Sequence, residues 1–198
     1  MILARMSPAD AKRRAVERHA DPVWLARQGT PAEWQLERLA ALKVEQAELA
    51  ADLQALGFAV ESPWELCEYE DSRDAGPTFL HHLHREYSDE VRSELARALA
   101  HKWAAPYWSE LTDLYLAASD HAKDQLAVVL SKIVTRRTLP VYLELIQDDQ
   151  NGSSRILMLR ALKRLRDPSG RAVLEKFQSH PVLGEEARRA VAGRSINS

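Results

Sequence analysis

The sequence predicts an all-α protein, and two observations support this prediction. Alanine, leucine, glutamate and arginine dominate the 198 residues, whereas the chain holds only 7 glycines and few runs of β-branched residues. Apolar residues also recur at helical spacing in two separate series along the second part of the chain. With 45% hydrophobic residues, a chain of this length can bury the core of one domain, with or without an appendage.

Start signals in the first part of the chain predict three helices. Ser7-Pro8, Thr30-Pro31 and Ser62-Pro63 each place a capping residue before a proline at the first helical position. The second of these helices meets no breaker before Gly57, which stands where a C-terminal cap is expected. The sequence therefore predicts one long helix over residues 31–56.

From residue 76 onward the chain repeats itself with a period of about 31 residues. One series of apolar residues is spaced by 31, 32 and 29 residues and consists of Leu99, Leu130, Leu162 and Val191. A second series lies upstream of the first, has a spacing of 31 or 32 residues, and consists of Leu80 with Leu83, Leu111 with Leu114, Leu143 with Ile146, and Leu174 with Phe177. Two series with one period predict two helices in each repeat.

One helix pair cannot bury both of its apolar stripes alone, so residues 76–198 are predicted to stack into a right-handed α-α solenoid of about four pairs. Over residues 76–193 the pattern resembles the HEAT-repeat family in its short bacterial form. This resemblance implies a concave surface lined by the second helices. Residues 1–75 are predicted to form an N-terminal helical cap over the first pair, and a dimer through the long helix is the alternative. We expect a monomer or a weak dimer.

In HEAT repeats an acid in the turn and a basic residue in the second helix often form a ladder between neighbouring units. Arg92, Lys123 and Arg155 occupy one repeat position here, and Asp149 precedes Arg155 by six residues, as the resemblance implies. Asp89 lies closer to its basic partner, which favours an N-cap at that position. The basic residues belong either to a structural ladder or to a ligand-binding surface.

Charge is distributed unevenly along the chain. Residues 1–75 and 76–150 carry formal charges of −5 and −3, whereas residues 151–198 carry +6. Much of this positive charge lies in residues 153–167, SSRILMLRALKRLRD, whose leucines form a core stripe and whose basic residues cover the opposite half. A basic end of this kind is compatible with binding of phosphates, with binding of an acidic protein partner, or with a terminal face that contacts only solvent. The isoelectric point of about 6.4 argues against a long nucleic-acid track.

Few residues favour catalysis or metal binding. His81 and His84 are three apart on a helix, but with His82 they flank core leucines, and no cysteine completes a metal set. Cys67 lies among glutamates that do not activate a thiolate. The sequence shows no phosphate loop, nucleophile elbow or zinc signature. We therefore expect no enzyme activity, no cofactor and no metal.

The location is also constrained by the sequence. A single cysteine excludes a disulfide within the chain, and the first residues, MILARMSPADAK, hold too short an apolar stretch for a signal peptide. No window approaches the roughly 18 uninterrupted apolar residues of a membrane helix. We expect a cytoplasmic protein that does not enter a membrane.

These observations predict a non-catalytic scaffold that binds a protein partner on the concave face of its second helices. The resemblance implies an immunity or adaptor protein as one concrete form. The alternative is a nucleic-acid-binding HEAT-like protein that uses the basic C-terminal repeats. The expected contact residues are the charged side chains of the second helices: Arg92, Arg97, Lys123, Asp124, Arg155, Arg160, Lys163 and Arg164.

Overall fold

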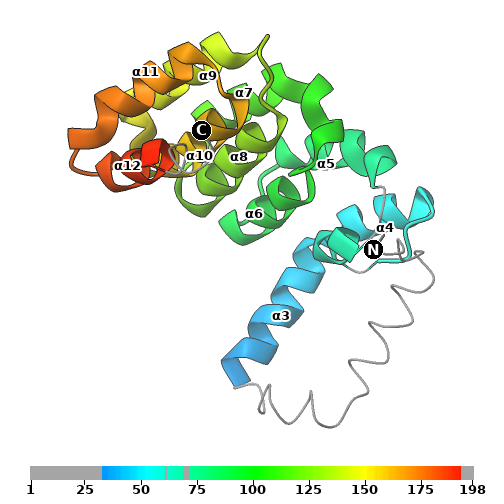
Figure 1. Cartoon of the computed structure of the whole chain (residues 1–198). Coiled ribbons are helices and arrows are strands. Elements are labelled where there is room, and N and C mark those ends of the chain that lie inside the picture. The colour runs from blue at the N-terminus through cyan, green and yellow to red at the C-terminus, as the bar shows by residue number, and fades with distance from the viewer. Residues whose placement is uncertain (1–32, 61, 69–71, 193–198) are drawn as a thin grey trace, which may run out of the picture. The chain divides into compact units, whose positions relative to one another are not determined.

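The computed structural model describes residues 33–60, 62–68 and 72–192, without the side chains of Glu33, Trp64, Cys67, Glu68 and Asp120. The described residues form ten α-helices and five short 3-10 helices and include no strand, which confirms the all-α prediction (Figure 1). The chain divides into two compact units, unit 1 from Met1 to Tyr87 and unit 2 from Ser88 to Ser198. The boundary predicted after residue 75 lies inside unit 1. The predicted starts at Ser7-Pro8 and Thr30-Pro31 lie outside the described residues.

Unit 1 contains the segment predicted as one long helix. It forms two helices, α3 (Glu33–Glu45) and α4 (Ala47–Ala55), which are separated at Gln46, so the prediction of an uninterrupted helix over residues 31–56 is wrong there. Gln46 is buried and its backbone lies at φ −88° and ψ 0°, outside ideal helical values. Packing begins just after this residue: Leu49 and Leu53 of α4 are buried, whereas α3 leaves most of its apolar side chains exposed.

The C-terminal end of α4 has the predicted glycine cap. Gly57 adopts a φ of +90°, a left-handed conformation that glycine enters without a steric cost. The Gly57 amide donates to the Gln54 carbonyl at 2.9 Å, and the Phe58 amide donates to the Leu53 carbonyl at 3.0 Å. These two bonds form a Schellman motif, and they confirm that the helix stops where the sequence predicts.

The described residues of unit 1 that follow α4 form short helical segments. The start predicted at Ser62-Pro63 opens the 3-10 helix η1 (Pro63–Glu68) rather than an α-helix, and η2 (Arg73–Ala75) leads into α5 (Gly76–Leu83). The α5 helix packs against α4. The buried apolar residues of unit 1 are Leu49, Leu53, Val60, Leu66, Ala75, Phe79, Leu80 and Leu83.

Unit 2 contains the helices predicted from the repeat. They are α6 (Asp89–Ala98), α7 (Trp108–Ala117), α8 (Asp120–Ile133), α9 (Leu139–Gln147), α10 (Arg155–Leu165), α11 (Pro168–Lys176) and α12 (Gly184–Ala192). Three 3-10 helices connect them: η3 (Lys102–Tyr107), η4 (Asp149–Ser154) and η5 (Phe177–Ser179). Helix α5, predicted as the partner of α6 in the first pair, belongs to unit 1.

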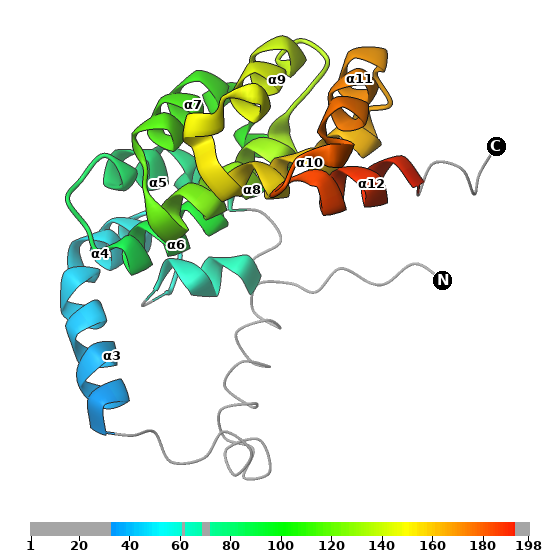
Figure 2. The same ribbon diagram turned by 90° about the vertical axis from the view of Figure 1, so that its left-hand side faces the viewer.

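The helices of unit 2 lie in two layers. Helix α6 packs against α8, α8 against α10, and α10 against α12, so the second helices of successive pairs are neighbours. Figure 2 shows α7, α9 and α11 in the other layer. The predicted apolar series lies between the layers: Leu99, Leu130 and Leu162 are fully buried, and Val191 in the last helix is half-buried.

Candidate functional site

A polar groove opens at the N-terminal ends of α8 and α10 in unit 2. It has a volume of about 530 Å³ and contains two of the predicted contact residues, Lys123 and Asp124. Its walls come from α6, from the first turn of α8 and from η4. The lining residues are Asp89, His121, Lys123, Asp124, Gln150, Asn151, Gly152, Ser153 and Ser154. We call this feature the polar groove.

Asp89 joins the two helices that form one wall of the groove. Its carboxylate accepts hydrogen bonds from the backbone amides of His121, at 3.2 Å, and Ala122, at 3.0 Å, in the first turn of α8. Helix α6 has its own cap, because the Ser88 hydroxyl accepts from the Val91 amide at 3.4 Å. Asp89 is therefore a capping residue, as predicted, but it caps the next second helix rather than its own.

Arg155 is buried behind the groove, so the prediction of an exposed contact residue is wrong. Its Nε donates to the Gly152 carbonyl at 2.8 Å, and its Nη1 donates to the Ile146 carbonyl at 3.3 Å and to Asp149 Oδ1 at 2.6 Å. The expected pairing of Asp149 with Arg155 is present, but it closes a single turn and does not connect neighbouring units. Three acceptors for one guanidinium explain why burial of this charge is tolerated.

A hydrogen-bonded network forms the floor of the groove. The buried Ser154 hydroxyl donates to the Asn151 carbonyl at 2.7 Å, so the Tyr115 hydroxyl, 2.8 Å away, donates to Ser154. Asn151 is also buried, and its amide donates to the Leu145 carbonyl at 3.0 Å. Burial raises the pKa of the Tyr115 hydroxyl, which keeps it protonated as a donor. Above this floor, Lys123 Nζ lies 4.9 Å from the centre of the Tyr115 ring, a cation–π contact.

Asn151 and Ser154 were not predicted as site residues. Residues 148–154, DDQNGSS, are rich in turn-forming residue types, and this composition is the only sequence signal for the floor. It predicts a turn but not that two of its side chains are buried. Gly152 adopts a φ of +59° in this turn, which requires glycine and directs the chain into α10.

Two of the predicted basic contact residues connect successive second helices. Arg160 is exposed and pairs with Glu186 of α12 at 2.9 Å. Arg164 donates from Nη2 to the Ser131 carbonyl at 2.9 Å and to the Val134 carbonyl at 3.4 Å. Because these carbonyls end α8, the Arg164 guanidinium caps the negative end of that helix. Both residues thus have structural contacts, away from the polar groove.

The remaining predicted contact residues lie outside the polar groove and do not form a common site. Lys163 is exposed on α10, and Arg97 is exposed on α6. Arg92 is half-buried, and its Nε, like Ser93 Oγ beside it, is buried without a hydrogen-bond partner among the described residues. The groove therefore brings together Lys123 and Asp124, and none of the other six predicted residues lines it.

The three histidines at the end of α5 do not point toward a common site. His82 is fully buried, with Nε2 2.9 Å from Asp52 Oδ2 and Nδ1 2.7 Å from the Tyr87 hydroxyl. His81 and His84 are exposed. The Asp52 carboxylate can only accept, so Nε2 of His82 carries a proton and donates it. In the neutral ring Nδ1 has no proton and accepts from the Tyr87 hydroxyl. Burial raises the pKa of Tyr87. Both ring nitrogens are thus used internally, and no group of three or more metal-ligating side chains occurs in the described part of the chain.

An ion pair lies beside this histidine. Arg85 forms a two-pronged contact with the carboxylate of Glu48, in which Nη2 lies 2.6 Å from Oε2. The hydrogen bond from Arg85 lowers the pKa of Glu48. Together these contacts join α4 to the end of α5, and they give this region of unit 1 a structural role.

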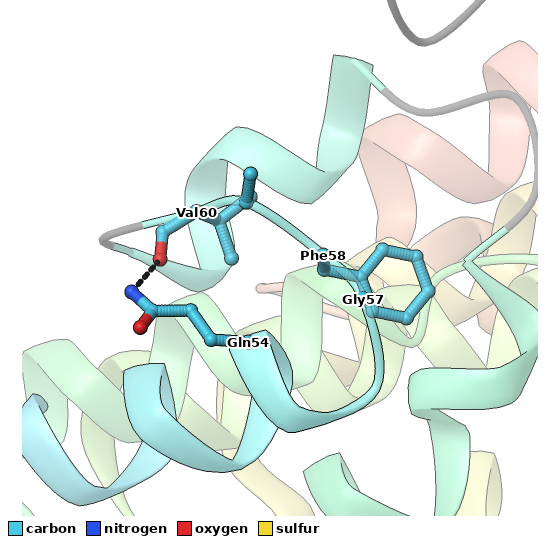
Figure 3. A pocket seen from close by; sticks show the side chains of 5 residues that line it. Gln54, Gly57, Phe58 and Val60 are labelled. Atoms are coloured by element: carbon cyan, nitrogen blue, oxygen red, sulfur yellow. Dashed lines mark hydrogen bonds between the residues drawn. The ribbon is translucent and has the colours of Figure 1, made fainter.

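A second hollow of about 420 Å³ follows the glycine cap of α4 and is lined by residues 57–60 with Gln54. Figure 3 shows the Gln54 amide pointing to the Val60 carbonyl, to which it donates at 3.1 Å. Phe58 lies on the other side of the turn in the same view. No charged side chain lines this hollow, and the side-chain amide of Gln54 already donates to the Val60 carbonyl. The hollow therefore offers no charged group for binding a ligand.

Within the described ranges, no helix combines the length and the apolar character needed to cross a membrane. Comparison with known proteins found no family model, no curated protein and no solved structure that matches this chain.

Proposed function

We propose that the chain is a non-catalytic scaffold that binds a protein partner, and that unit 2 is a short HEAT-like solenoid whose second helices carry the binding surface. The two-layer packing of α6 to α12, with successive second helices as neighbours, supports the solenoid. The polar groove is the observation that carries the function, because it combines a fixed floor with an open rim of charged side chains. An immunity or adaptor protein is the concrete form that this proposal takes.

The chemistry of the rim favours a protein over other partners. Lys123 lies beside Asp124 and Asp89, so the groove presents both signs of charge within one helical turn. The carboxylates would repel a phosphate backbone, whereas small-molecule sites are lined mainly by apolar side chains. Protein interfaces outside their centre are polar, hydrated and rich in paired charges, which is the character of this groove.

The floor of the groove favours binding over catalysis. The Ser154 hydroxyl donates its proton to the Asn151 carbonyl and not to a base, so its oxygen is not activated as a nucleophile. His121 lies in the groove with its backbone amide bound to Asp89. The buried polar groups are therefore engaged in holding the shape of the surface.

A site-specific crosslinking experiment tests the proposal. A photoreactive amino acid is placed at the exposed Ser153 on the rim, and at the exposed Val141 on α9 as the control. We expect one defined protein adduct at position 153 in cells and none at position 141. The adduct is identified by mass spectrometry, and its binding is then measured with both proteins purified.

A charge-reversal pair completes this test. Asp124→Lys is expected to weaken binding of the purified partner, whereas Glu144→Lys, on the exposed face of α9, is expected to leave it unchanged. Equal adducts at positions 141 and 153, or an adduct that disappears on nuclease treatment, would contradict the proposal. The second result would favour the nucleic-acid alternative.

A further inference from the structure

Five exposed basic side chains lie at the C-terminal ends of α8 and α10, away from the polar groove. We call them the basic edge: Lys132, Arg136, Arg137, Lys163 and Arg166. None of them forms an ion pair with a residue that the structure describes. The two helix ends are held together by Arg164, which donates from α10 to the carbonyls of Ser131 and Val134 in α8. The side chains of the basic edge therefore lie around two adjacent helix ends of unit 2.

The first part of this surface is a rigid turn. The Thr135 amide donates to Thr138 Oγ1 at 3.0 Å, and the Thr138 amide donates to Thr135 Oγ1 at 3.4 Å. Arg136 and Arg137 lie between these two threonines and are exposed. Reciprocal side-chain bonds of this kind fix the turn before any partner arrives, which lowers the entropy lost on binding.

The second part is the turn after α10. Arg166 ends this helix with a φ of +54°, the only positive φ outside glycine in the described residues. Glycine or asparagine is usual at such a cap, because a long side chain is strained there. Asp167 then caps α11 by accepting from the Ser169 amide at 3.0 Å. The pKa of Asp167 is lowered mainly by the Ser169 bonds and, to a smaller extent, by the charge of Arg136.

The helix dipoles explain only part of this cluster. Cations in the last turn of a helix interact favourably with its carbonyl end, which accounts for Lys132 and Lys163. Arg136 and Arg137 lie beyond the end of α8, and Arg166 occupies a conformation in which glycine would be more stable. Residues in strained backbone conformations occur often at functional sites, so Arg166 is a candidate contact residue.

We propose that the basic edge binds an acidic segment of the partner protein. This inference rests on the proposed function, since it names the chemistry that the partner presents. Packed helices lie about 8–10 Å apart, so an acidic segment of a few extended residues is long enough to reach cations in both turns. The surface thus fits a short acidic segment through charge complementarity.

The extent of the surface argues against a nucleic acid. A nucleic-acid track requires free cations along successive repeats. In α12 the basic residues are already engaged: Arg188 donates to the Gln178 carbonyl, and Arg189 pairs with Glu185. Both basic side chains of α12 are thus engaged, so the unpaired cations of the basic edge do not continue onto that helix.

Fluorescence anisotropy with the full-length protein tests this inference. The probe is a fluorescein-labelled peptide of eight glutamates, and the matched control peptide has eight glutamines. We expect the glutamate peptide to bind at low ionic strength, with an affinity that falls as salt is added, and the glutamine peptide not to bind. Arg137→Gln and Lys163→Gln should each weaken binding about threefold, and together about tenfold. Arg171→Gln, at an exposed site paired with Glu175, should have no effect.

Substitution of Arg166 separates a binding role from a structural one. Arg166→Gly should raise the midpoint of thermal unfolding, because the left-handed cap is relieved, while it weakens peptide binding about threefold. Arg166→Lys should leave both quantities close to those of the unmodified protein. A purely structural role would move stability without moving affinity.

Three results would overturn the inference: no binding of the glutamate peptide at low ionic strength, equal binding of the glutamine peptide, or tighter binding of a 12-nucleotide single strand or a 20-base-pair duplex. Unchanged affinity in Arg166→Gly would remove Arg166 from the site. The crosslink at position 153 is independent of these measurements. If it persists while the peptide fails to bind, only the basic edge is wrong, and if it fails while the peptide binds, only the groove is wrong.

Discussion

Arg155 supplies two hydrogen bonds to the turn before α10, at Gly152 and Asp149, and a third to the Ile146 carbonyl of α9. We expect Arg155→Ala to lower the free energy of unfolding by about 2–4 kcal/mol, because buried carbonyls lose their donor and a cavity forms. Arg155→Lys should recover only part of this loss, since an ammonium cannot reproduce the planar fork.

Urea denaturation measures the effect. Arg171→Ala is the matched control, because its pair with Glu175 is exposed and is expected to contribute about 0.5 kcal/mol or less. A loss for Arg155→Ala no larger than that of the control would contradict the structural role assigned to Arg155.

Tyr142 makes stability depend on alkaline pH. Its hydroxyl is buried and donates to the Met158 carbonyl at 2.7 Å, and burial raises its pKa far above the ordinary value. The folded state therefore retains this proton after the unfolded state has lost it. The stabilisation is fully present below pH about 10, where the unfolded tyrosine titrates, and it decreases as the pH rises further.

Tyr142→Phe isolates this contribution. We expect the variant to be less stable at neutral pH by about 1 kcal/mol, because the Met158 carbonyl loses its donor. Its stability should also fall less steeply above pH 10 than that of the unmodified protein. Thermal unfolding from pH 7 to 11 provides the comparison, and parallel curves for the two proteins would show that Tyr142 is not the responsible group.

For single residues, the sequence predicted which side chains cap helices or form ion pairs, but not their tertiary contacts or burial. Asp89 was predicted as a cap because it lies close to Arg92 in the sequence, and Asp149 was expected to pair with Arg155 because the HEAT resemblance implies it. The sequence did not predict that Asp89 caps a helix 32 residues away or that Arg155 is buried, because both depend on the packing of separate segments.

Gly184, the first residue of α12, lies where there is no room for a side chain. A Cβ at this position would lie 2.7 Å from the Gln178 carbonyl oxygen, which is backbone and cannot move aside. We expect Gly184→Ala to destabilise the protein by about 1–3 kcal/mol, as overpacking does. Gly170 in α11 is the control, because a Cβ there would meet Leu162 at 3.4 Å, an ordinary contact.

Gly170→Ala should therefore be neutral or stabilising by up to about 1 kcal/mol, since alanine is the better helix former. Chemical denaturation of both variants is the measurement. Similar losses in the two would show that the contact with Gln178 is not the cause.

Helices in general were predictable where local signals determine them. The glycine cap after α4 follows from chain chemistry alone, as do the helices that recur in unit 2. The break at Gln46 does not, because helical periodicity continues through it and the interruption coincides with the point where α4 becomes buried. The basic edge was also not predicted. Residues 76–150 have a negative net charge, so the regional charge gave no sign of the basic pair Arg136 and Arg137.

For the whole molecule, truncation distinguishes the boundary seen in the structure from the one predicted after residue 75. Removal of residues 1–57 deletes Leu49 and Leu53 and the Asp52 partner of His82, so the apolar side chains of α5 lose their cover. We expect a fragment of residues 58–198 to aggregate or to unfold partly. A fragment of residues 88–198, which begins with unit 2, should be soluble and should melt cooperatively.

Size-exclusion chromatography with light scattering, followed by thermal melting, tests both fragments. The same measurement on the intact chain at several concentrations determines whether it is a monomer or a weak dimer. A fragment 58–198 that melts cooperatively would show that the first helices are an independent arm.

The contacts of α8 also determine how unit 2 comes apart. Asp89 of α6 closes one end of this helix and Arg164 of α10 closes the other, so neither end is satisfied by its own chain segment. Loss of either neighbour exposes backbone groups of α8 and removes part of its stability. Partial unfolding from one side should therefore propagate into α8 rather than stop at it, and the central repeats should open as a single foldon, later than the fraying last helix.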